Sequence, residues 1–156
     1  MSSLLTLSIG IGLAVSLLFS ELFGLAAGGM VVPGYFALFL NQPINVAVTL
    51  GTGILTFSLV HALSVIAIVY GRRRTVLMIL TGFLLGLGIE ALPESLFSSL
   101  AANGPVADVE VIGYIIPGHI GSWIDRQGLN ETIRVLLTSS VVVRLILILL
   151  GVELGT

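Results

Sequence analysis

A seven-residue sequence pattern occurs twice in this chain, 84 residues apart. The first copy is Gly-Met-Val-Val-Pro-Gly-Tyr at 29–35, and the second is Gly-Tyr-Ile-Ile-Pro-Gly-His at 113–119. Proline lacks the backbone N–H and glycine is the poorest ordinary helix former, so neither copy fits inside a continuous α-helix. Both copies nevertheless lie in apolar sequence. Helix breaks at matching positions of two hydrophobic halves are typical of the functional centre of a membrane protein.

The composition indicates an integral membrane protein. Of the 156 residues, 56% are hydrophobic and only 9% are charged, whereas soluble domains have about a quarter charged residues. Residues 22–71 contain no Asp, Glu, Lys or Arg, and one helical span needs only about 20 apolar residues, so this stretch has room for two spans. The chain also has no cysteine, which excludes disulfides, thiolate catalysis and cysteine-ligated metals.

We predict an all-α integral membrane protein, a single domain over 1–156 that consists of two pseudo-symmetric halves. Each half contains a helix, a segment broken at Pro-Gly and a second helix. The expected helices are 4–20, 44–69, 75–92 and 130–150, and the broken segments are 22–40 and 111–124. The halves therefore cover about 4–69 and 75–150, with a basic loop at 70–74 between them and an exposed loop at 93–110.

The topology depends on whether the broken segments cross the membrane. The positive-inside rule places the consecutive arginines at 72–74 in the cytoplasm. If the broken segments cross, the halves form an inverted repeat and Asp125 and Arg126 are cytoplasmic as well; if they are re-entrant, the halves are parallel and Arg126 lies outside. The positive-inside rule favours the inverted arrangement. As a helix, 111–124 would span only about 21 Å of a core of about 30 Å, so it must be partly extended or must thin the bilayer.

Small residues mark the faces on which we expect helices to pack. The first helix has a small residue at every fourth position, namely Ser8, Gly12, Ser16 and Ser20. Gly82 and Gly86 have the GxxxG spacing in a later helix. Such residues let two helix backbones approach closely in lipid. We favour packing within the chain, with the seam of a homo-oligomer as the alternative.

Polar and basic residues near the breaks form our candidate site for an anionic ligand or polymer. The freed backbone groups cannot face lipid, and half-helix ends carry partial positive charge suited to an anion. His119 can relay protons or bind a carboxylate, and Arg144, inside an apolar helix, needs a partner such as Glu21 or Glu90. Structural kinks, a hydrogen-bonded histidine and acids solvated at helix ends are the alternatives. The complete set is Pro33, Gly34, Tyr35, Asn41, Gln42, Pro117, Gly118, His119, Arg126, Gln127, Arg134 and Arg144.

The basic loop has two interpretations. In the simpler one it is a topology signal that contacts phospholipids, and in the other it docks a cytoplasmic partner. Its residues are Tyr70, Gly71, Arg72, Arg73 and Arg74.

We expect no catalysis by this chain alone. It has no Walker-type loop, no Ser-His-Asp set and no haem motif. Its two histidines, His61 and His119, are too few for a metal site of the common kinds. We therefore expect no cofactor or metal in this chain and no nucleic-acid partner.

Five ordered blocks of sequence carry a family resemblance. They are Val-Val-Pro-Gly-Tyr at 31–35, Asn-Gln-Pro at 41–43, Tyr-Gly-Arg-Arg at 70–73, Gly-Tyr-Ile-Ile-Pro-Gly at 113–118 and Arg-Gln-Gly-Leu at 126–129. Together, over nearly the whole chain, they resemble the capsule biosynthesis CapC family, also called PgsC, the small membrane subunit of bacterial poly-γ-glutamate synthase. The resemblance implies a multi-pass protein of the bacterial cell membrane that assembles with other small subunits and with a cytoplasmic Mur-type amide ligase that uses ATP and magnesium. It implies no catalytic residue in this chain.

Three functional hypotheses follow. The first is a non-catalytic subunit of the capsule poly-γ-glutamate synthase complex that docks the ligase through 70–74 and helps translocate the polymer. Because poly-γ-glutamate carries one carboxylate per residue, its path needs positive partial charge and little fixed negative charge. The second is a stand-alone inverted-repeat anion transporter or channel, gated at the Pro-Gly pairs. The third is a membrane-embedded transferase that uses His119.

Overall fold

The computed structural model describes residues 2–93 and 111–151, and the side chains of these residues from position 3 onward. The described part is all-helical, as predicted. Its helices are α1 (Ser2–Phe23), α2 (Val32–Phe39), α3 (Pro43–Ile66), α4 (Arg72–Glu90), α6 (Ile116–Gln127) and α7 (Leu129–Leu149). The four long helices begin and end within three residues of the predicted limits. Most of the predicted exposed loop at 93–110 lies outside the described residues.

Three of these helices are long and apolar enough to cross a membrane, over Ser3–Phe23, Pro43–Ile66 and Leu129–Leu149. The fourth long helix, α4, has 19 residues, with arginines in its first turn and Glu90 as its last residue. Large apolar side chains such as Leu17, Leu59, Leu84 and Leu145 are exposed on the outer faces of the four helices. An exterior of this kind suits contact with lipid tails and agrees with a membrane protein.

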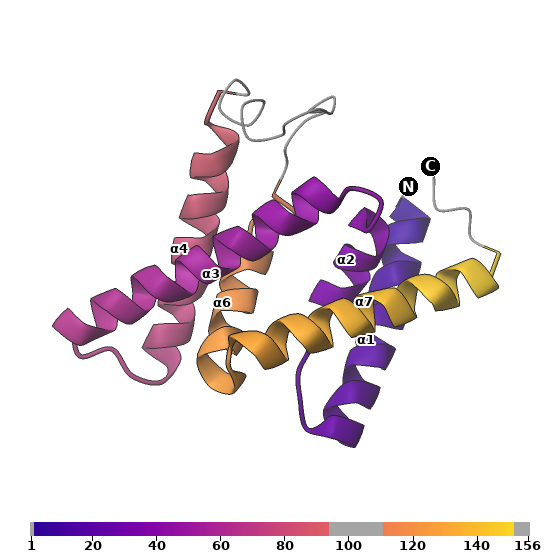
Figure 1. Ribbon diagram of the computed structural model, residues 1–156, viewed down its shortest axis with the longest axis horizontal. Helices are drawn as coiled ribbons and strands as arrows, with labels where there is room; N and C mark the ends of the chain where they lie inside the picture. Colours follow the sequence, from indigo (N-terminus) through magenta and orange to yellow (C-terminus); the bar gives the residue numbers. More distant parts are fainter. Residues whose placement is uncertain (1, 94–110, 152–156) are drawn as a thin grey trace.

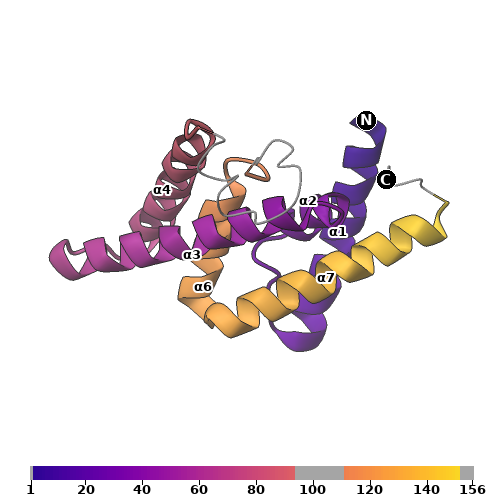
Figure 2. The same cartoon turned by 45° about the horizontal axis from the view of Figure 1, so that its top comes forward.

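The helices form two side-by-side groups that are linked by the long helices α3 and α7. In Figures 1 and 2, α1 and α4 lie toward opposite sides of the molecule and run in opposite directions. The short helix α2 packs along α1, and the short helix α6 packs along α4. The long helix α3 packs on α6 and α4, whereas α7 packs on α2 and α1. Each of these long helices therefore contacts mainly the short helix of the other half.

Glycine pairs let the short helices approach their neighbours closely. A Cβ atom built on Gly12 would lie 2.7 Å from the Cα of Gly34, and one built on Gly82 would lie 2.6 Å from the Cα of Gly118. The Ser8 hydroxyl also donates a hydrogen bond to the carbonyl oxygen of Gly34 at 2.7 Å. The predicted small-residue faces are thus used for packing within the chain, α1 on α2 and α4 on α6.

The buried core lies where the long and short helices cross. One cluster joins α2, α3, α6 and α7 with the segment that precedes α6, and contains Val32, Phe36, Val46, Ile112, Ile116, Ile120, Ile124 and Leu136. A second cluster joins α1, α2 and α7 through Val15, Ala37, Val143 and Leu147. Both halves contribute to each cluster, so neither half has a separate core.

The structure corrects the predicted position of the helix breaks. The Pro-Gly pairs at 33–34 and 117–118 lie in the first turn of α2 and of α6, and not in the middle of a helix. A proline in the first turn loses no helical hydrogen bond, because the first N–H groups of a helix have no partner within it. The non-helical chain lies before each short helix, for example at Gly28 and Gly29, whose φ angles are +72° and +124°.

Neither short helix crosses a bilayer core by itself. α2 has 8 residues and α6 has 12, which correspond to about 12 Å and 18 Å of helix. If these segments cross a core of about 30 Å, the remaining distance comes from the non-helical chain that precedes each helix.

Candidate functional site

The two copies of the repeated sequence line one cavity of about 660 Å³. The first copy contributes Gly29, Met30, Val31, Val32 and Tyr35, and the second contributes Gly113, Tyr114, Ile115, Ile116 and His119. Phe83 of α4 and Trp123 of α6 complete the lining. The two copies, 84 residues apart in sequence, therefore meet at this cavity.

His119 reaches from the second copy toward the first. Its Nδ1 lies 3.1 Å from the carbonyl oxygen of Ile115, so a proton on Nδ1 donates to that oxygen and leaves Nε2 as an acceptor. A Cβ atom built on Gly29 would lie 3.4 Å from His119 Cδ2, which places the imidazole ring against the first copy. The cavity therefore contains one histidine in a wall that is otherwise mostly apolar and aromatic.

The ends of two helices open onto the same cavity. Val31 precedes α2 and Ile115 precedes α6, and neither helix has a side-chain hydrogen bond that caps its first turn. The positive ends of the two helix dipoles thus converge there. No Asp or Glu is among the described residues that line the cavity. A wall with partial positive charge and no fixed negative charge suits an anion with an apolar backbone better than a cation.

The Pro-Gly pairs lie behind the cavity and position it. Pro33, Gly34, Pro117 and Gly118 are buried. A Cβ atom on Gly34 would lie 2.7 Å from the carbonyl oxygen of Ser8, and one on Gly118 would lie 2.5 Å from the Cα of Ile79. These glycines hold the short helices against α1 and α4 and so fix where the two copies begin.

The structure separates the other predicted site residues from this cavity. Of the twelve predicted residues, only Tyr35 and His119 line it. Besides the four Pro-Gly residues, those outside its lining are Asn41, Gln42, Arg126, Gln127, Arg134 and Arg144. Arg134 lies exposed on α7, and the Gln42 Oε1 accepts a hydrogen bond from the Asn45 Nδ2 at 2.7 Å.

Arg144 finds a different partner from the two acids that we expected. Its guanidinium donates a hydrogen bond to the Asn41 Oδ1, because α7 packs on α2 and Asn41 follows the end of that helix. Glu90 instead accepts a hydrogen bond from the Tyr114 hydroxyl at 2.5 Å, and Glu21 is exposed at the far end of α1. The expected pairing of Arg144 with Glu21 or Glu90 is therefore wrong.

Gln127 ties the second half to the segment before α2. Its Oε1 accepts a hydrogen bond from the Ala26 N–H at 3.1 Å, and its Nε2 donates to the Ala26 carbonyl oxygen at 2.6 Å. In the same way, Thr49 of α3 holds the segment before α6: its hydroxyl oxygen accepts a hydrogen bond from the Ile112 N–H at 2.9 Å. The stretches that lead into α2 and α6 are each held by the other half. Thr49 was not predicted from the sequence, although Thr49, Thr52 and Thr56 form a buried series at every third or fourth position.

The basic loop lies beside the end of α6. Arg74 forms an ion pair of 2.5 Å with Asp125 and lies 3.4 Å from His61 Nδ1. Tyr70, Arg72 and Arg73 are exposed, and Tyr70 has 76% of its surface accessible. Asp125 entered the predicted topology, but its pairing with Arg74 was not predicted from the sequence. A contact between residues 51 positions apart has no local sequence signal.

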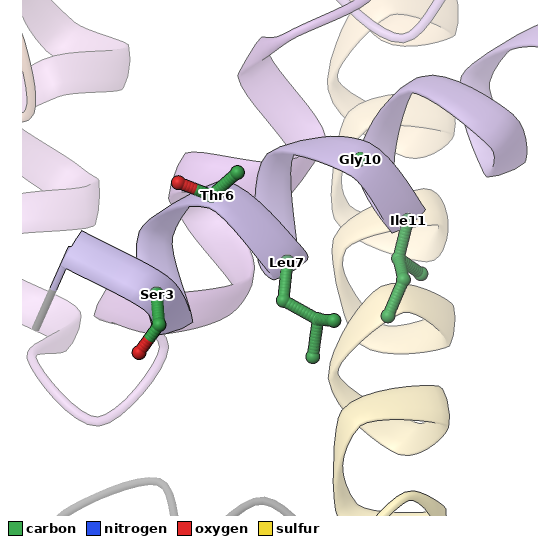
Figure 3. Close-up of a pocket in the computed structure, with 5 residues that line it drawn as sticks. All are labelled: Ser3, Thr6, Leu7, Gly10 and Ile11. Carbon is green, nitrogen blue, oxygen red and sulfur yellow. The ribbon is translucent and has the colours of Figure 1, made fainter.

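Another hollow, of about 610 Å³, lies along the first turns of α1 (Figure 3). It is lined by Ser3, Thr6, Leu7, Gly10 and Ile11, none of which is titratable at physiological pH. We assign no chemistry to it. Within the described residues, no three His, Asp or Glu side chains come together in a group that could hold a metal ion.

Comparison with known proteins places this arrangement in a family context. The family model described as Capsule biosynthesis CapC matches residues 11–133. The PGA biosynthesis protein CapC of Bacillus subtilis (strain 168) is 37% identical over 124 residues, which cover 78% of each chain. The Capsule biosynthesis protein CapC of Bacillus anthracis is 38% identical over 131 residues, which cover 83% of each chain. No solved structure gives a significant match.

Proposed function

Because this chain belongs to the capsule biosynthesis CapC family, we propose that it is the non-catalytic membrane subunit of a bacterial poly-γ-glutamate synthase. In this role it docks a cytoplasmic Mur-type amide ligase, which uses ATP and magnesium, and helps the nascent polymer cross the cell membrane. Other small subunits complete the assembly. The names of the two relatives support capsule and PGA biosynthesis as the process, and the exposed loop and the cavity support the finer role.

The exposed turn between α3 and α4 carries the docking proposal. Ile66 at the end of α3 and Ile68 and Tyr70 in the turn are largely exposed, and Arg72 and Arg73 follow in the first turn of α4. Aromatic and arginine side chains on one exposed segment are typical anchors of protein interfaces. Arg74 does not share this role, because its ion pair with Asp125 holds it against α6.

The same ion pair supports an inverted arrangement of the two halves. The crossing topology requires Asp125 to lie on the membrane face that carries the basic loop, and the Arg74–Asp125 contact fits that requirement. The paired packing of α1 on α2 and of α4 on α6, together with the opposite directions of α1 and α4 in Figure 1, supports it as well. We propose six crossings, with each short helix and its preceding chain counted as one.

The shared cavity supports a role in polymer passage. Poly-γ-glutamate alternates methylene and amide groups with carboxylates. The methylene groups can pack on the apolar wall while a carboxylate meets the positive ends of α2 and α6. His119 can donate a hydrogen bond to that carboxylate only from Nε2, when that nitrogen also carries a proton. Because Arg126, Arg134 and Arg144 lie outside the cavity, the proposed path depends on the helix ends and on His119.

The docking proposal is tested by the double variant Tyr70→Ala/Arg73→Gln. Arg74 is kept, so the ion pair with Asp125 and the fold around it remain. We expect about a tenfold loss of co-purified ligase from membranes, because two exposed anchors are removed. Arg134→Gln, which removes an exposed arginine on α7, is the control and should retain the ligase. Unchanged co-purification of the ligase with the double variant would refute docking at this turn.

The shared cavity also favours one alternative function, a stand-alone anion transporter. Purified protein in liposomes, without any ligase, would then carry anion flux that falls when Gly34 or Gly118 is replaced. Polymer formed only when the ligase is added, with no flux from this chain alone, supports the synthase subunit.

A further inference from the structure

A hollow at the start of α4 combines basic and apolar side chains. It has a volume of about 520 Å³ and is lined by Gly71, Arg72, Thr75, Val76 and Arg126. These residues belong to the start of α4 and the end of α6, two segments that lie in the lower part of Figure 1. The Arg126 Nη2 lies 3.4 Å from the Thr75 Oγ1, so a guanidinium from one half and a hydroxyl from the other face the same space.

The positive charge of this hollow is not balanced within the described part of the chain. The nearby Asp125 already forms an ion pair with Arg74. Among the described residues, no carboxylate forms an ion pair with Arg72, Arg73 or Arg126. The first turn of α4 adds the positive end of a helix dipole, so arginines there repel both the dipole and one another. An anion bound between Arg72 and Arg126 would relieve this repulsion.

The surface of α4 that continues from the hollow shows which anion fits. Val76, Leu80 and Leu84 follow Arg72 at four-residue intervals on one face of α4 and are 62%, 51% and 58% exposed. Beside them, the Arg126 guanidinium lies 5.4 Å from the centre of the Trp123 ring, a pairing typical of the region where membrane and water meet. A basic hollow at the end of an apolar strip matches a phospholipid, which has a phosphate at one end and acyl chains along the other.

We propose that this hollow binds the phosphate of an anionic phospholipid. The Arg72 and Arg126 guanidinium groups donate hydrogen bonds to the phosphodiester oxygens, and the Thr75 hydroxyl lies within the same space to donate another. One acyl chain follows the strip of Val76, Leu80 and Leu84. The lipid thereby joins α4 and α6 at the membrane face that carries the basic loop.

The chain offers a matched control for the test. Arg72→Gln/Arg126→Gln removes two exposed arginines that line the hollow, and Arg73→Gln/Arg134→Gln removes two exposed arginines that do not. Delipidated protein in detergent is titrated with dioleoyl phosphatidylglycerol, with dioleoyl phosphatidylcholine or with inorganic phosphate, and bound ligand is counted by native mass spectrometry. The purified chain is used alone, so the result does not depend on the proposed ligase.

We expect wild-type protein to retain one phosphatidylglycerol and to bind it more tightly than phosphatidylcholine. Arg72→Gln/Arg126→Gln should weaken that binding by about tenfold or more, whereas the control variant should stay within about twofold of wild type. Equal losses in both variants, or no loss in either, would overturn the proposal. Inorganic phosphate that displaces the lipid at millimolar concentration would overturn it as well, because the hollow would then take a soluble anion.

Discussion

Replacing Gly82 by alanine tests the closest helix contact of the second half. The new Cβ would lie 2.4 Å from the backbone nitrogen of Gly118 and 2.6 Å from its Cα. Carbon atoms pack best at about 3.5–4.0 Å, so the contact is too short by about 1 Å. Both atoms that it meets belong to the backbone, so no side-chain rotation relieves it and α4 must move away from α6. Overpacking of this kind costs about 1–3 kcal/mol of unfolding free energy.

A second glycine of the same helix supplies the control. A Cβ on Gly88 would meet nothing within 4 Å. Alanine in place of glycine inside a helix gains up to about 1 kcal/mol, and this gain is common to both variants. The difference between Gly82→Ala and Gly88→Ala therefore isolates the packing cost of about 1–3 kcal/mol. In a chain of this length it lowers the melting temperature by about 2–4 °C for each kcal/mol.

The assay is thermal unfolding in detergent, followed by the loss of the monodisperse peak in size-exclusion chromatography. The first half provides a repeat of the experiment. Gly12→Ala should destabilise because its Cβ would lie 2.7 Å from the Gly34 Cα, whereas Gly10 has open space. If Gly82→Ala melts at or above the temperature of Gly88→Ala, α4 and α6 do not pack as described and the reasoning fails.

Three further substitutions test other parts of the argument. Gln127→Ala removes the hydrogen bonds to the N–H and to the carbonyl oxygen of Ala26. We therefore expect the free energy of unfolding, measured by thermal unfolding, to fall by about 1–3 kcal/mol. A change within experimental error would show that these two hydrogen bonds are not needed for stability. Arg126→Cys in this cysteine-free chain should be labelled by a membrane-impermeant maleimide only after permeabilisation, and labelling on intact cells would contradict the inverted arrangement. His119→Gln keeps a hydrogen-bonding side chain in the cavity, so polymer formation by the complete synthase should continue at a reduced rate; complete loss with intact assembly would instead support the transferase.

Much of the helical architecture could be predicted from local sequence. Apolar runs longer than a bilayer core and breakers such as Pro43 and Gly71 determine where long helices begin and end, and these are local properties. The Pro-Gly pairs were harder to interpret, since proline breaks a helix interior and also favours a first turn. Only the tertiary structure distinguishes the two, because only there does the chain before Val32 and Ile116 turn away from the helix axis.

The candidate site was predictable in part for a related reason. The repeat of one sequence at 29–35 and 113–119 predicted that two segments share a centre, and both line the cavity. The pairing of side chains followed no such rule. Arg144 bonds to Asn41, 103 positions away, and Arg74 pairs with Asp125, 51 positions away. Which polar groups meet depends on which helices cross.

By itself, the sequence determined an all-helical chain with helices long and apolar enough to cross a membrane, because hydrophobic length, breakers and small residues act over a few helical turns. The tertiary structure decided which helices pack together: α3 packs on α6, and α7 packs on α2. Either short helix could pack with either long helix as far as local pattern is concerned. The choice is made by shape, where glycines such as Gly34 and Gly118 allow backbones to touch, and by buried ties such as that of Gln127 to Ala26. Those contacts exist only once both halves have assembled.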